Sequence, residues 1–322
     1  MGLWLVNADT VATSRFVISP LAETLACLIA LLRSTADTPA AQEWLGRHQP
    51  AYRAQLASDP VTGLLVRAMI RTGWITDFLT PPPGGTGDAD FAAELAVVRR
   101  TGPAAARADV AVTLGGGPVP DALDRDDLAP RAADLLDWVW RETVLPYWPR
   151  RRRILEAEIV ARTAQLSQHG WAATLDDMRP GMRWLGDGRL QINAYDYPPL
   201  EISGGRLAFV PVTPRTGWVT WNDRDQYAVI YPCSGVLAED GPAAVAPAAL
   251  SALLGPGRAT VLAQLGTPMS TTQLVAVTGQ GLGSVGRHLK ILLDAGLVRR
   301  RRSGRSVLYY RTETGEALIT AD

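Results

Sequence analysis

Basic side chains gather near the C-terminus, where their spacing suits contact with phosphate groups. Four consecutive arginines, Arg299–Arg302, precede a Ser303-Gly304 turn, and Arg305 follows it. Arg287 and Lys290 lie three residues apart a short distance upstream. Guanidinium and ammonium groups form charge-assisted hydrogen bonds with phosphate, and arginine can also bond two atoms of a guanine edge. These residues therefore predict a surface that binds nucleic acid.

Two short helices joined by a turn would position the upstream pair of basic residues. Ser270 can cap a first helix over residues 271–277, because its hydroxyl accepts from the free backbone amides at the helix start. Residues 278–281 form the turn, and a second helix is expected over residues 282–295 before Gly296 ends it. Apolar residues at helical spacing predict the buried face of the second helix: Leu282, Val285, Leu289, Leu292 and Leu293.

A basic hairpin is expected directly after the second helix. Residues 297–302 and 305–311 favour strands and flank the Ser303-Gly304 turn. A helix that fits the major groove, beside a hairpin that reaches the backbone, is a DNA-reading device. The expected DNA-binding residues are Thr271, Thr272, Gln280, Gly283, Ser284, Arg287, His288, Lys290, Arg301, Arg302 and Arg305.

The position of each residue suggests its role. Arg287 is expected to bond a base edge, most often guanine, or a phosphate. Gln280, Gly283 and Ser284 are expected close to the groove floor. The hairpin arginines would hold the backbone or the adjoining minor groove, which makes affinity depend on salt. His288 would be either a DNA contact or a packing partner where two helices meet.

The sequence around Arg287 resembles the ArsR/SmtB family of winged-helix repressors. Residues 286–298 (GRHLKILLDAGLV) are similar to the family's Ser-Arg-His-Leu core and Gly-Leu-Val ending, with glycine replacing the serine. Tyr309-Tyr310-Arg311 resembles the end of the family's hairpin, and residues 253–262 resemble its opening helices. The resemblance covers roughly residues 248–315. It implies a winged helix-turn-helix that binds double-stranded DNA at a near-palindromic operator as a homodimer.

One departure from the family concerns metal ions. Metal-sensing members carry a Cys-x-Cys pair on the helix before the recognition helix, or His and carboxylate ligands on the last helix. Here residues 271–277 contain no Cys, His or acid, and residues 312–322 contain Glu313, Glu316 and Asp322 but no His. Zinc favours closely spaced Cys and His ligands. We therefore expect no metal site, and we expect no cofactor.

Length and charge predict two unlike domains. The chain has 322 residues, which fits about two domains, and its formal net charge is zero. Residues 251–322 hold nine basic and four acidic residues, so this part carries +5 and the rest carries −5. A bias toward arginine explains why Lys290 is the only lysine, but it does not explain clustering at the hairpin. The asymmetry favours one end that faces nucleic acid.

Cysteine usage and hydropathy point to the cytoplasm. Cys27 and Cys233 lie far apart and do not form a disulfide framework, which favours a reducing compartment. The N-terminal residues lack a basic segment typical of a signal peptide. The longest apolar run, near residues 25–32, is too short to cross a bilayer. We expect a cytoplasmic protein with no membrane partner.

The fold class expected is α+β. A mostly helical domain over residues 1–240 contains a small antiparallel β section near residues 182–232, and a winged helix follows over residues 248–322. Residues 237–248 are a linker by composition. Helices are expected near residues 20–33, 38–47, 60–72, 88–99, 127–145 and 150–169. A Gly-Asp-Gly turn at residues 186–188 predicts a hairpin, and the arginines at 150–153 are expected to pair with acids.

The large domain is a candidate sensor for a small molecule. Among its ten tryptophans, Trp138, Trp140 and Trp148 cluster at a break between two long helices and are the best candidates for a ligand pocket. Plain core packing is the alternative for each of them. No catalytic set is evident, so no enzymatic activity is expected. A nucleophile at Cys233-Ser234-Gly235 near His169 is the weaker alternative.

Two rival functions remain open at this level. The winged helix would serve as a protein-interaction surface if its recognition helix is too weak to read DNA, and three glycines favour that reading: Gly281, Gly283 and Gly286. The clustered arginines argue against it. The other rival is an enzyme in the N-terminal domain with a DNA-binding unit appended.

Overall fold

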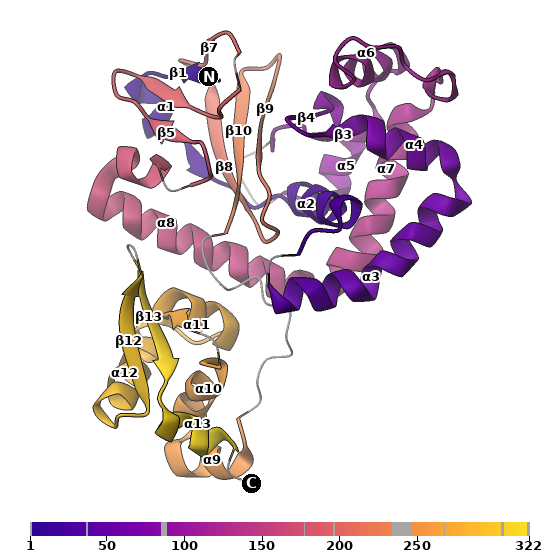
Figure 1. Cartoon of the computed structure of the whole chain (residues 1–322). Coiled ribbons are helices and arrows are strands. Elements are labelled where there is room, and N and C mark those ends of the chain that lie inside the picture. The colour runs from indigo at the N-terminus through magenta and orange to yellow at the C-terminus, as the bar shows by residue number, and fades with distance from the viewer. Residues whose placement is uncertain are drawn as a thin grey trace.

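A computed structural model describes residues 2–36, 38–84, 89–176, 178–195, 197–233, 246–266, 268–303 and 306–320. Helices and small sheets form a large N-terminal body, and a smaller C-terminal unit lies against one of its helices (Figure 1). The α+β class is confirmed. No helix within the described ranges combines the length and apolar character needed to cross a membrane.

Three helices of the N-terminal body begin in the same way. α2 (Pro20–Arg33), α3 (Pro39–Ser58) and α4 (Pro60–Met69) each start with a proline. The residue before each proline is Ser, Thr or Asp, and its side chain accepts a backbone N–H of the first turn. These caps confirm the expected starts, although α3 runs through Pro50 to Ser58 instead of ending near residue 47. The other helices of this body are α1 (Ala8–Ala12), α5 (Phe91–Arg99), α6 (Pro103–Thr113), α7 (Leu128–Val139) and α8 (Trp148–Asp176).

The chain winds from α7 into α8 with little interruption. A π-helical turn (Trp140–Val144) and a 3-10 turn (Leu145–Tyr147) join the two helices, so the break expected at the prolines is a change of helical pitch. α8 has its kink further on, at Gly170, where φ is 74°. Glycine adopts this backbone conformation without the cost that other residues incur. The expectation that the helix ends at Gly170 is confirmed in this sense.

Two four-stranded sheets form the β part of the N-terminal body. The first has the order β5 (Arg183–Trp184), β6 (Arg189–Gln191), β1 (Leu3–Leu5) and β7 (Leu200–Glu201). The second has the order β2 (Arg15–Phe16), β8 (Arg206–Val212), β10 (Gln226–Pro232) and β9 (Trp218–Asn222). β5 and β6 pair as the expected hairpin, with Asp187 at φ 51° in its turn.

The pairing of these strands differs from the wholly antiparallel arrangement expected. β8 pairs in parallel with both β10 and β2, and β1 pairs in parallel with β7. The strands β1 and β2 come from the first sixteen residues and insert beside strands nearly two hundred residues later. A further hairpin joins β3 (Ile70–Arg71) to β4 (Trp74–Ile75). The start and end of the body are therefore held together by sheet hydrogen bonds.

α2 lies at the centre of the larger core. Every residue from Pro20 to Leu31 is buried, against α7 and one face of the sheet that contains β8 and β10. The opposite face of that sheet packs in a second core around Phe209 and Trp4. Burying a single leucine or isoleucine contributes about 1.5–3 kcal/mol, so a helix this enclosed anchors the body.

The arginines at the start of α8 are paired with acids. Arg151 is buried and forms an ion pair of 2.6 Å with Glu23 of α2. It also donates to Thr213 and lies 5.4 Å from the centre of the Trp44 ring. Arg152 pairs with Glu156 on the surface at 2.9 Å. The expectation that this basic run pairs with acids, rather than contacting DNA, is met by these two residues.

The C-terminal unit has its own core of buried apolar residues. The part of the expected linker up to residue 245 lies outside the described residues. The helices of the unit are α9 (Ala248–Leu254), α10 (Pro256–Gln264), α11 (Thr271–Thr278), α12 (Leu282–Asp294) and α13 (Glu313–Thr320). Its strands are β11 (Met269–Ser270), β12 (Val298–Ser303) and β13 (Ser306–Arg311).

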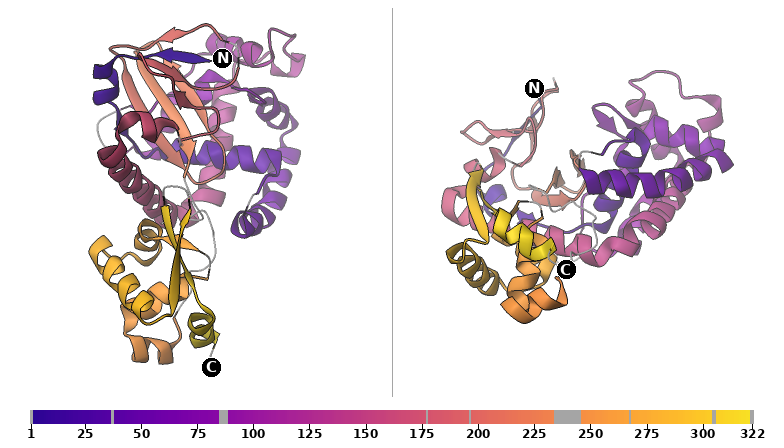
Figure 2. Two further views of the ribbon diagram at one scale, coloured as in Figure 1. Left: turned by 60° about the vertical axis from the view of Figure 1, so that its left-hand side comes forward. Right: turned by 60° about the horizontal axis from the view of Figure 1, so that its bottom comes forward.

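The C-terminal unit contacts the N-terminal body through α11, which packs against α8 (Figures 1 and 2). Val277 of α11 packs against the buried residues Ile154 and Ala157 of α8. Figure 1 shows α12 on the side of the unit that faces away from α8, whereas the strands β12 and β13 extend toward α8. The contact therefore leaves the outward face of α12 uncovered.

Candidate nucleic-acid interface

α11 and α12 form a helix-turn-helix whose start and turn are fixed by local bonds. The Ser270 hydroxyl accepts the backbone N–H of Gln273 at 3.2 Å, and the Gln273 side chain accepts the backbone N–H of Ser270. This reciprocal capping box satisfies two amides that the helix leaves free. Gly279 follows α11 with φ at 68°, a left-handed conformation that glycine tolerates. The chain then turns, and Gly281 caps α12.

The buried face of α12 agrees with the expected spacing except at its first residue. Val285, Leu289 and Leu292 are almost fully buried in the core of the unit. Leu282 is 55% exposed, which corrects the expectation that it lies on the buried face. It occupies the first turn of α12, before the helix reaches the core formed with α10 and α11. Ile291 is also exposed, so two apolar side chains border the outward face.

The outward face of α12 carries the basic residues. Gly283, Arg287 and Lys290 are exposed and follow the helical spacing of one face. A Cβ added at Gly283 or Gly286 would meet no atom within 4 Å, so the backbone is open to solvent there. This face can approach a ligand closely with both charge and bare backbone.

His288 lies where α12 meets the start of α10. A Cβ added at Gly257 of α10 would lie only 2.7 Å from its Nε2, so glycine is required for this approach. The ring also lies 3.2 Å from the Ser284 hydroxyl. Partial burial, followed by the charges of Arg258 and Arg287, lowers the pKa of His288. Of the two roles expected for His288, the structure places it in helix packing.

Gln280 also contacts the start of α10. Its side-chain amide donates to the backbone carbonyl of Gly257 at 3.3 Å, and its own carbonyl oxygen is buried without a partner among the described residues. It therefore holds the turn against α10 rather than projecting freely toward a groove. Thr271 is half-buried at the start of α11. Thr272 lies in α11, but its side chain lies outside the described residues.

The basic hairpin consists of β12 and β13. It belongs to a three-stranded sheet with the order β11, β13, β12. Residues Arg299 to Arg302 are all exposed on β12, and β11 ties the hairpin to the start of α11 through the pair Ser270 and Leu308. Alternate residues of a strand point to opposite faces, so arginines project from both faces of this hairpin. Arg305, expected to bind DNA, lies outside the described residues.

Among the residues that the structure describes, these cations have no acidic partner. Within the described part of the chain, no carboxylate forms an ion pair or hydrogen bond with any of six exposed residues, namely Arg287, Lys290, Arg299, Arg300, Arg301 and Arg302. Arg311, at the base of the hairpin, differs because it pairs with Glu316 at 3.0 Å. Unpaired arginines on one surface are available to phosphate groups, whose binding they favour electrostatically.

The tryptophans proposed as a ligand pocket lie in aromatic packing. Trp140 is buried and stacks on Phe91 with the ring centres 4.5 Å apart. Trp148 meets Trp140 edge-on at 5.2 Å, and Trp138 packs against the larger core. The two cavities described below take no side chain from these three residues. Core packing, the alternative considered for each, therefore describes their positions.

The cysteine considered as a nucleophile is not activated. Burial, reinforced by Glu158 and Glu23, raises the pKa of the Cys233 thiol well above its usual value, so the reactive thiolate is disfavoured. Ser234 and Gly235 lie outside the described residues. His169 is exposed on α8. Among the described residues, no three His, Cys, Asp or Glu side chains lie close enough together to hold a metal ion.

Sequence reasoning missed one large cavity of the N-terminal body. It has a volume of about 500 Å³ and is lined by other tryptophans, including Trp74 and Trp218, together with Tyr195, Tyr197 and Arg179. A signal was present in residues 193–199 (NAYDYPP), where two tyrosines and two prolines occur within five residues of a stretch with no strand or helix pattern. Local pattern alone does not show which tryptophans border a cavity and which fill a core.

The comparison with protein families agrees with this geometry. Residues 256–300, which run from the start of α10 into β12, match bacterial regulatory proteins of the arsR family. No match to the chain was found among curated proteins or among solved structures. The family match is therefore confined to the C-terminal unit.

Proposed function

The C-terminal unit is a helix-turn-helix of the arsR family of bacterial regulatory proteins, and on this basis we propose that the chain is a DNA-binding transcriptional repressor. α12 would enter the major groove, with Arg287 at a base edge or phosphate. Arg301 and Arg302 would contact the backbone. The observation that carries the proposal is the exposed, unpaired set of basic residues on α12 and β12.

We further propose that the protein acts as a homodimer in the cytoplasm. One recognition helix reads only a few base pairs, and two helices one DNA turn apart would read a near-palindromic operator. The N-terminal body would sense a small molecule and has no enzymatic role in this proposal. Residues 271–277 contain no Cys, His or acid and residues 312–322 contain no His, so in this proposal the effector is an organic molecule rather than a metal ion.

A mobility-shift assay tests the proposal. The full chain is titrated against the DNA upstream of its own gene at two salt concentrations, with an excess of unrelated competitor DNA. A sequence-selective shift that weakens steeply with salt supports the regulator. Binding that competitor DNA abolishes equally well would contradict it and would favour use of the winged helix for protein contacts.

A further inference from the structure

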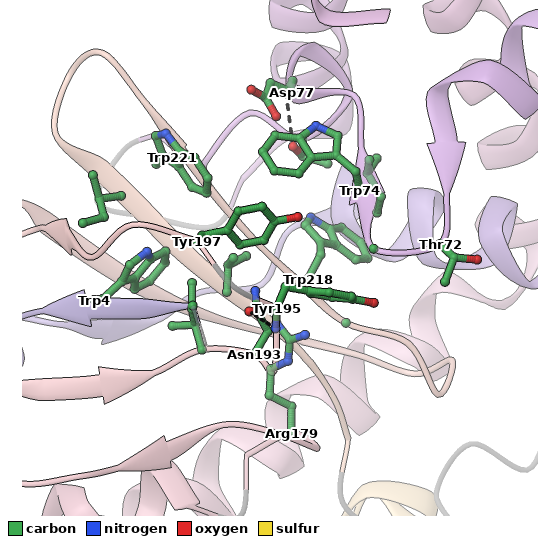
Figure 3. Close-up of a pocket in the computed structure, with 18 of the residues that line it drawn as sticks. Trp4, Thr72, Trp74, Asp77, Arg179, Asn193, Tyr195, Tyr197, Trp218 and Trp221 are labelled. Carbon is green, nitrogen blue, oxygen red and sulfur yellow. Dashed lines mark hydrogen bonds between the residues drawn. The ribbon is translucent and has the colours of Figure 1, made fainter. Parts of the chain in front are cut away.

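The large cavity lies between the helical and the β parts of the N-terminal body. Its wall takes residues from β1, the end of α2, the hairpin of β3 and β4, the segment before β7, and β9 (Figure 3). Its volume of about 500 Å³ is that of a pocket for a drug-sized molecule. Segments from both ends of the sequence meet there, so a molecule bound in it would touch both parts of the body at once.

Six aromatic side chains line the cavity. Trp74 meets Tyr197 edge-on at 5.7 Å and Trp221 edge-on at 6.5 Å. Tyr195, Tyr197 and Trp221 are each 39–46% exposed, although they surround a concave site. A ligand that covers these exposed rings would bind favourably, because burial of a ring removes a large apolar area from water. A flat aromatic molecule would cover these rings and stack or pack edge-on with them.

Three polar donors at this wall have no acceptor among the described residues. The indole N–H groups of Trp74 and Trp218, and Nη1 of Arg179, are buried and have no hydrogen-bond partner among the described residues. A buried donor that is left unpaired destabilises the structure, because its desolvation is not compensated. Trp218 is only 8% exposed, so water cannot readily replace the missing partner. These three donors are therefore left without an acceptor among the described residues, and a ligand with acceptor atoms suits them better than one with donors only.

Among these donors, Arg179 is the one that most favours an anionic partner. No carboxylate pairs with it in the described part of the chain, and burial lowers its pKa. Figure 3 shows its guanidinium reaching toward Asn193 and Tyr195, beneath the aromatic rings. A desolvated guanidinium without a counter-ion is costly, and its planar fork matches a carboxylate.

The other charged side chains at the cavity also favour an anionic ligand. Arg33 and Arg71 also line the cavity, whereas Asp77 is the single acid among the described residues of its wall. Partial burial and the nearby Asp109 raise the pKa of Asp77 to about 6, which reduces its negative charge in mildly acidic solution. Aromatic cages can also hold cations. Three arginines against one acid among the described lining residues disfavour a cation.

We propose that this cavity binds a planar aromatic acid in its anionic form, with the ring among Trp74, Trp218 and Tyr197 and the carboxylate on Arg179. The binding itself stands on the cavity, and only its consequence for DNA rests on the proposed function. The molecule would be the effector of the regulator. Its affinity for the protein with or without DNA would then differ.

Isothermal titration calorimetry of the full chain tests the binding directly, with 2-naphthoate and 9-anthroate as probes. We expect one site per chain for at least one of them, and clearly weaker binding of 2-naphthamide and of 2-naphthylmethylammonium. Failure of both carboxylates to bind at millimolar concentration would overturn the proposal. Tighter binding of the ammonium probe than of 2-naphthoate would overturn it as well.

Variants locate the carboxylate. Arg179→Met should weaken 2-naphthoate about tenfold or more, because a charge-assisted bond is lost, and should change 2-naphthamide little. Arg179→Lys keeps the charge without the fork and should weaken 2-naphthoate less than Arg179→Met does. Arg53→Met, which changes an exposed arginine of α3, is the matched control. Equal weakening of both probes in the folded Arg179 variants would contradict the assignment of Arg179.

The readouts separate this proposal from the regulatory one. Calorimetry contains no DNA, so a failed mobility shift leaves the binding result intact. A mobility shift repeated with 2-naphthoate then tests the effector role alone. Binding without any change in the shift would retain the site and remove its assignment as the effector site.

Discussion

Arg287 lies at the centre of the outward face of α12, and its guanidinium bonds to no other described residue. A side chain in that position is free to bond DNA. The neighbouring His288 and Gln280 are used differently, because both are held against Gly257. The same short segment thus separates residues that fix the helix from residues that face outward.

We expect Arg287→Ala to weaken DNA binding by about 1–3 kcal/mol and to relax the preference at one base pair. The reason is the loss of a bond to a base edge. Affinities for an operator and for its single-base variants measure the effect. An equal loss on every sequence would instead identify Arg287 as a phosphate contact.

His288 should make the C-terminal unit sensitive to acid. Its pKa in the folded state lies below the ordinary value of 6.5, so the unfolded chain binds the proton first as the pH falls. Stability is therefore complete above pH 6.5 and declines as the pH falls below it. His288→Gln should flatten that decline in denaturant titrations across pH 5–8.

The exposed His169 offers a matched control. His169→Gln should leave the acid dependence of stability as it is in the unaltered chain. If His288→Gln and His169→Gln change it equally, packing of His288 against α10 is not the cause.

At the scale of elements, the hairpin of β12 and β13 and the helix α12 make different contributions to binding. The hairpin presents arginines on both faces, which suits contacts with a charged backbone at several angles. α12 presents bare backbone and few side chains. We expect the hairpin to govern salt dependence and α12 to govern sequence preference.

Arg301→Ala combined with Arg302→Ala should weaken binding to all DNA sequences. Each lost phosphate contact reduces the slope of log affinity against log salt by about 0.9, so the double variant should lower it by up to ~2. Binding measured at four or more salt concentrations gives the slope. Arg53→Ala with Arg100→Ala, both exposed on the N-terminal body, is the control pair. An unchanged slope in the hairpin variant would refute the backbone contacts.

Gly286→Ala should stabilise the C-terminal unit by about 1 kcal/mol, because alanine favours the helix and the added Cβ meets open space. Thermal unfolding measures this. Gly257→Ala should do the opposite, since its Cβ would collide with His288. Weaker DNA binding by the stabilised Gly286→Ala chain would mean that the glycine allows close approach to DNA. Stronger binding would mean that α12 becomes ordered on DNA.

Sequence patterns such as helix caps and turn residues correctly predicted the elements that depend on neighbouring residues alone. Caps at Ser19 and Ser270 and the turn at residues 186–188 gave correct starts and a correct hairpin. The strands β1 and β2 were missed because three or two residues have no pattern of their own and gain their strand form from distant partners. α6 was missed because its alanine-rich sequence has weak amphipathic spacing.

In the candidate sites, too, the features with local causes were predicted and those that depend on the tertiary fold were not. The outward position of Arg287 and the exposed hairpin arginines follow from helical and strand periods, and both were predicted. The burial of Leu282 was wrong because period does not show where a helix leaves its core. The cavity was missed because the wall joins residues 2–4, 71–80 and 179–221, and only the tertiary fold unites them.

At the scale of the whole molecule, α8 connects the two parts of the chain. Its first turns hold Arg151, which borders a second cavity that shares Ile29, Arg33 and Thr216 with the aromatic one. Its next turns hold Ile154 and Ala157 against Val277 of α11. One helix thus contacts both the neighbourhood of the cavity and the first helix of the helix-turn-helix.

Ile154→Ala should loosen the contact between α8 and α11. The buried side chain leaves a void next to Val277, so amides of α11 should exchange with deuterium faster while those of α7 remain protected. Val160→Ala, at a side chain 54% exposed on the same helix, should change neither. Uniform acceleration throughout the chain would indicate global destabilisation rather than a loosened contact.

The packing of Val277 against α8 also limits how chimaeras of this protein can be designed. A chimaera that replaces residues 246–320 with another winged helix would keep the N-terminal body but lose the apolar contact at Ile154 and Ala157. Such a hybrid would lose the packing of the C-terminal unit against α8. A biosensor grafted from this chain therefore has to transplant the surface of α11 together with α8.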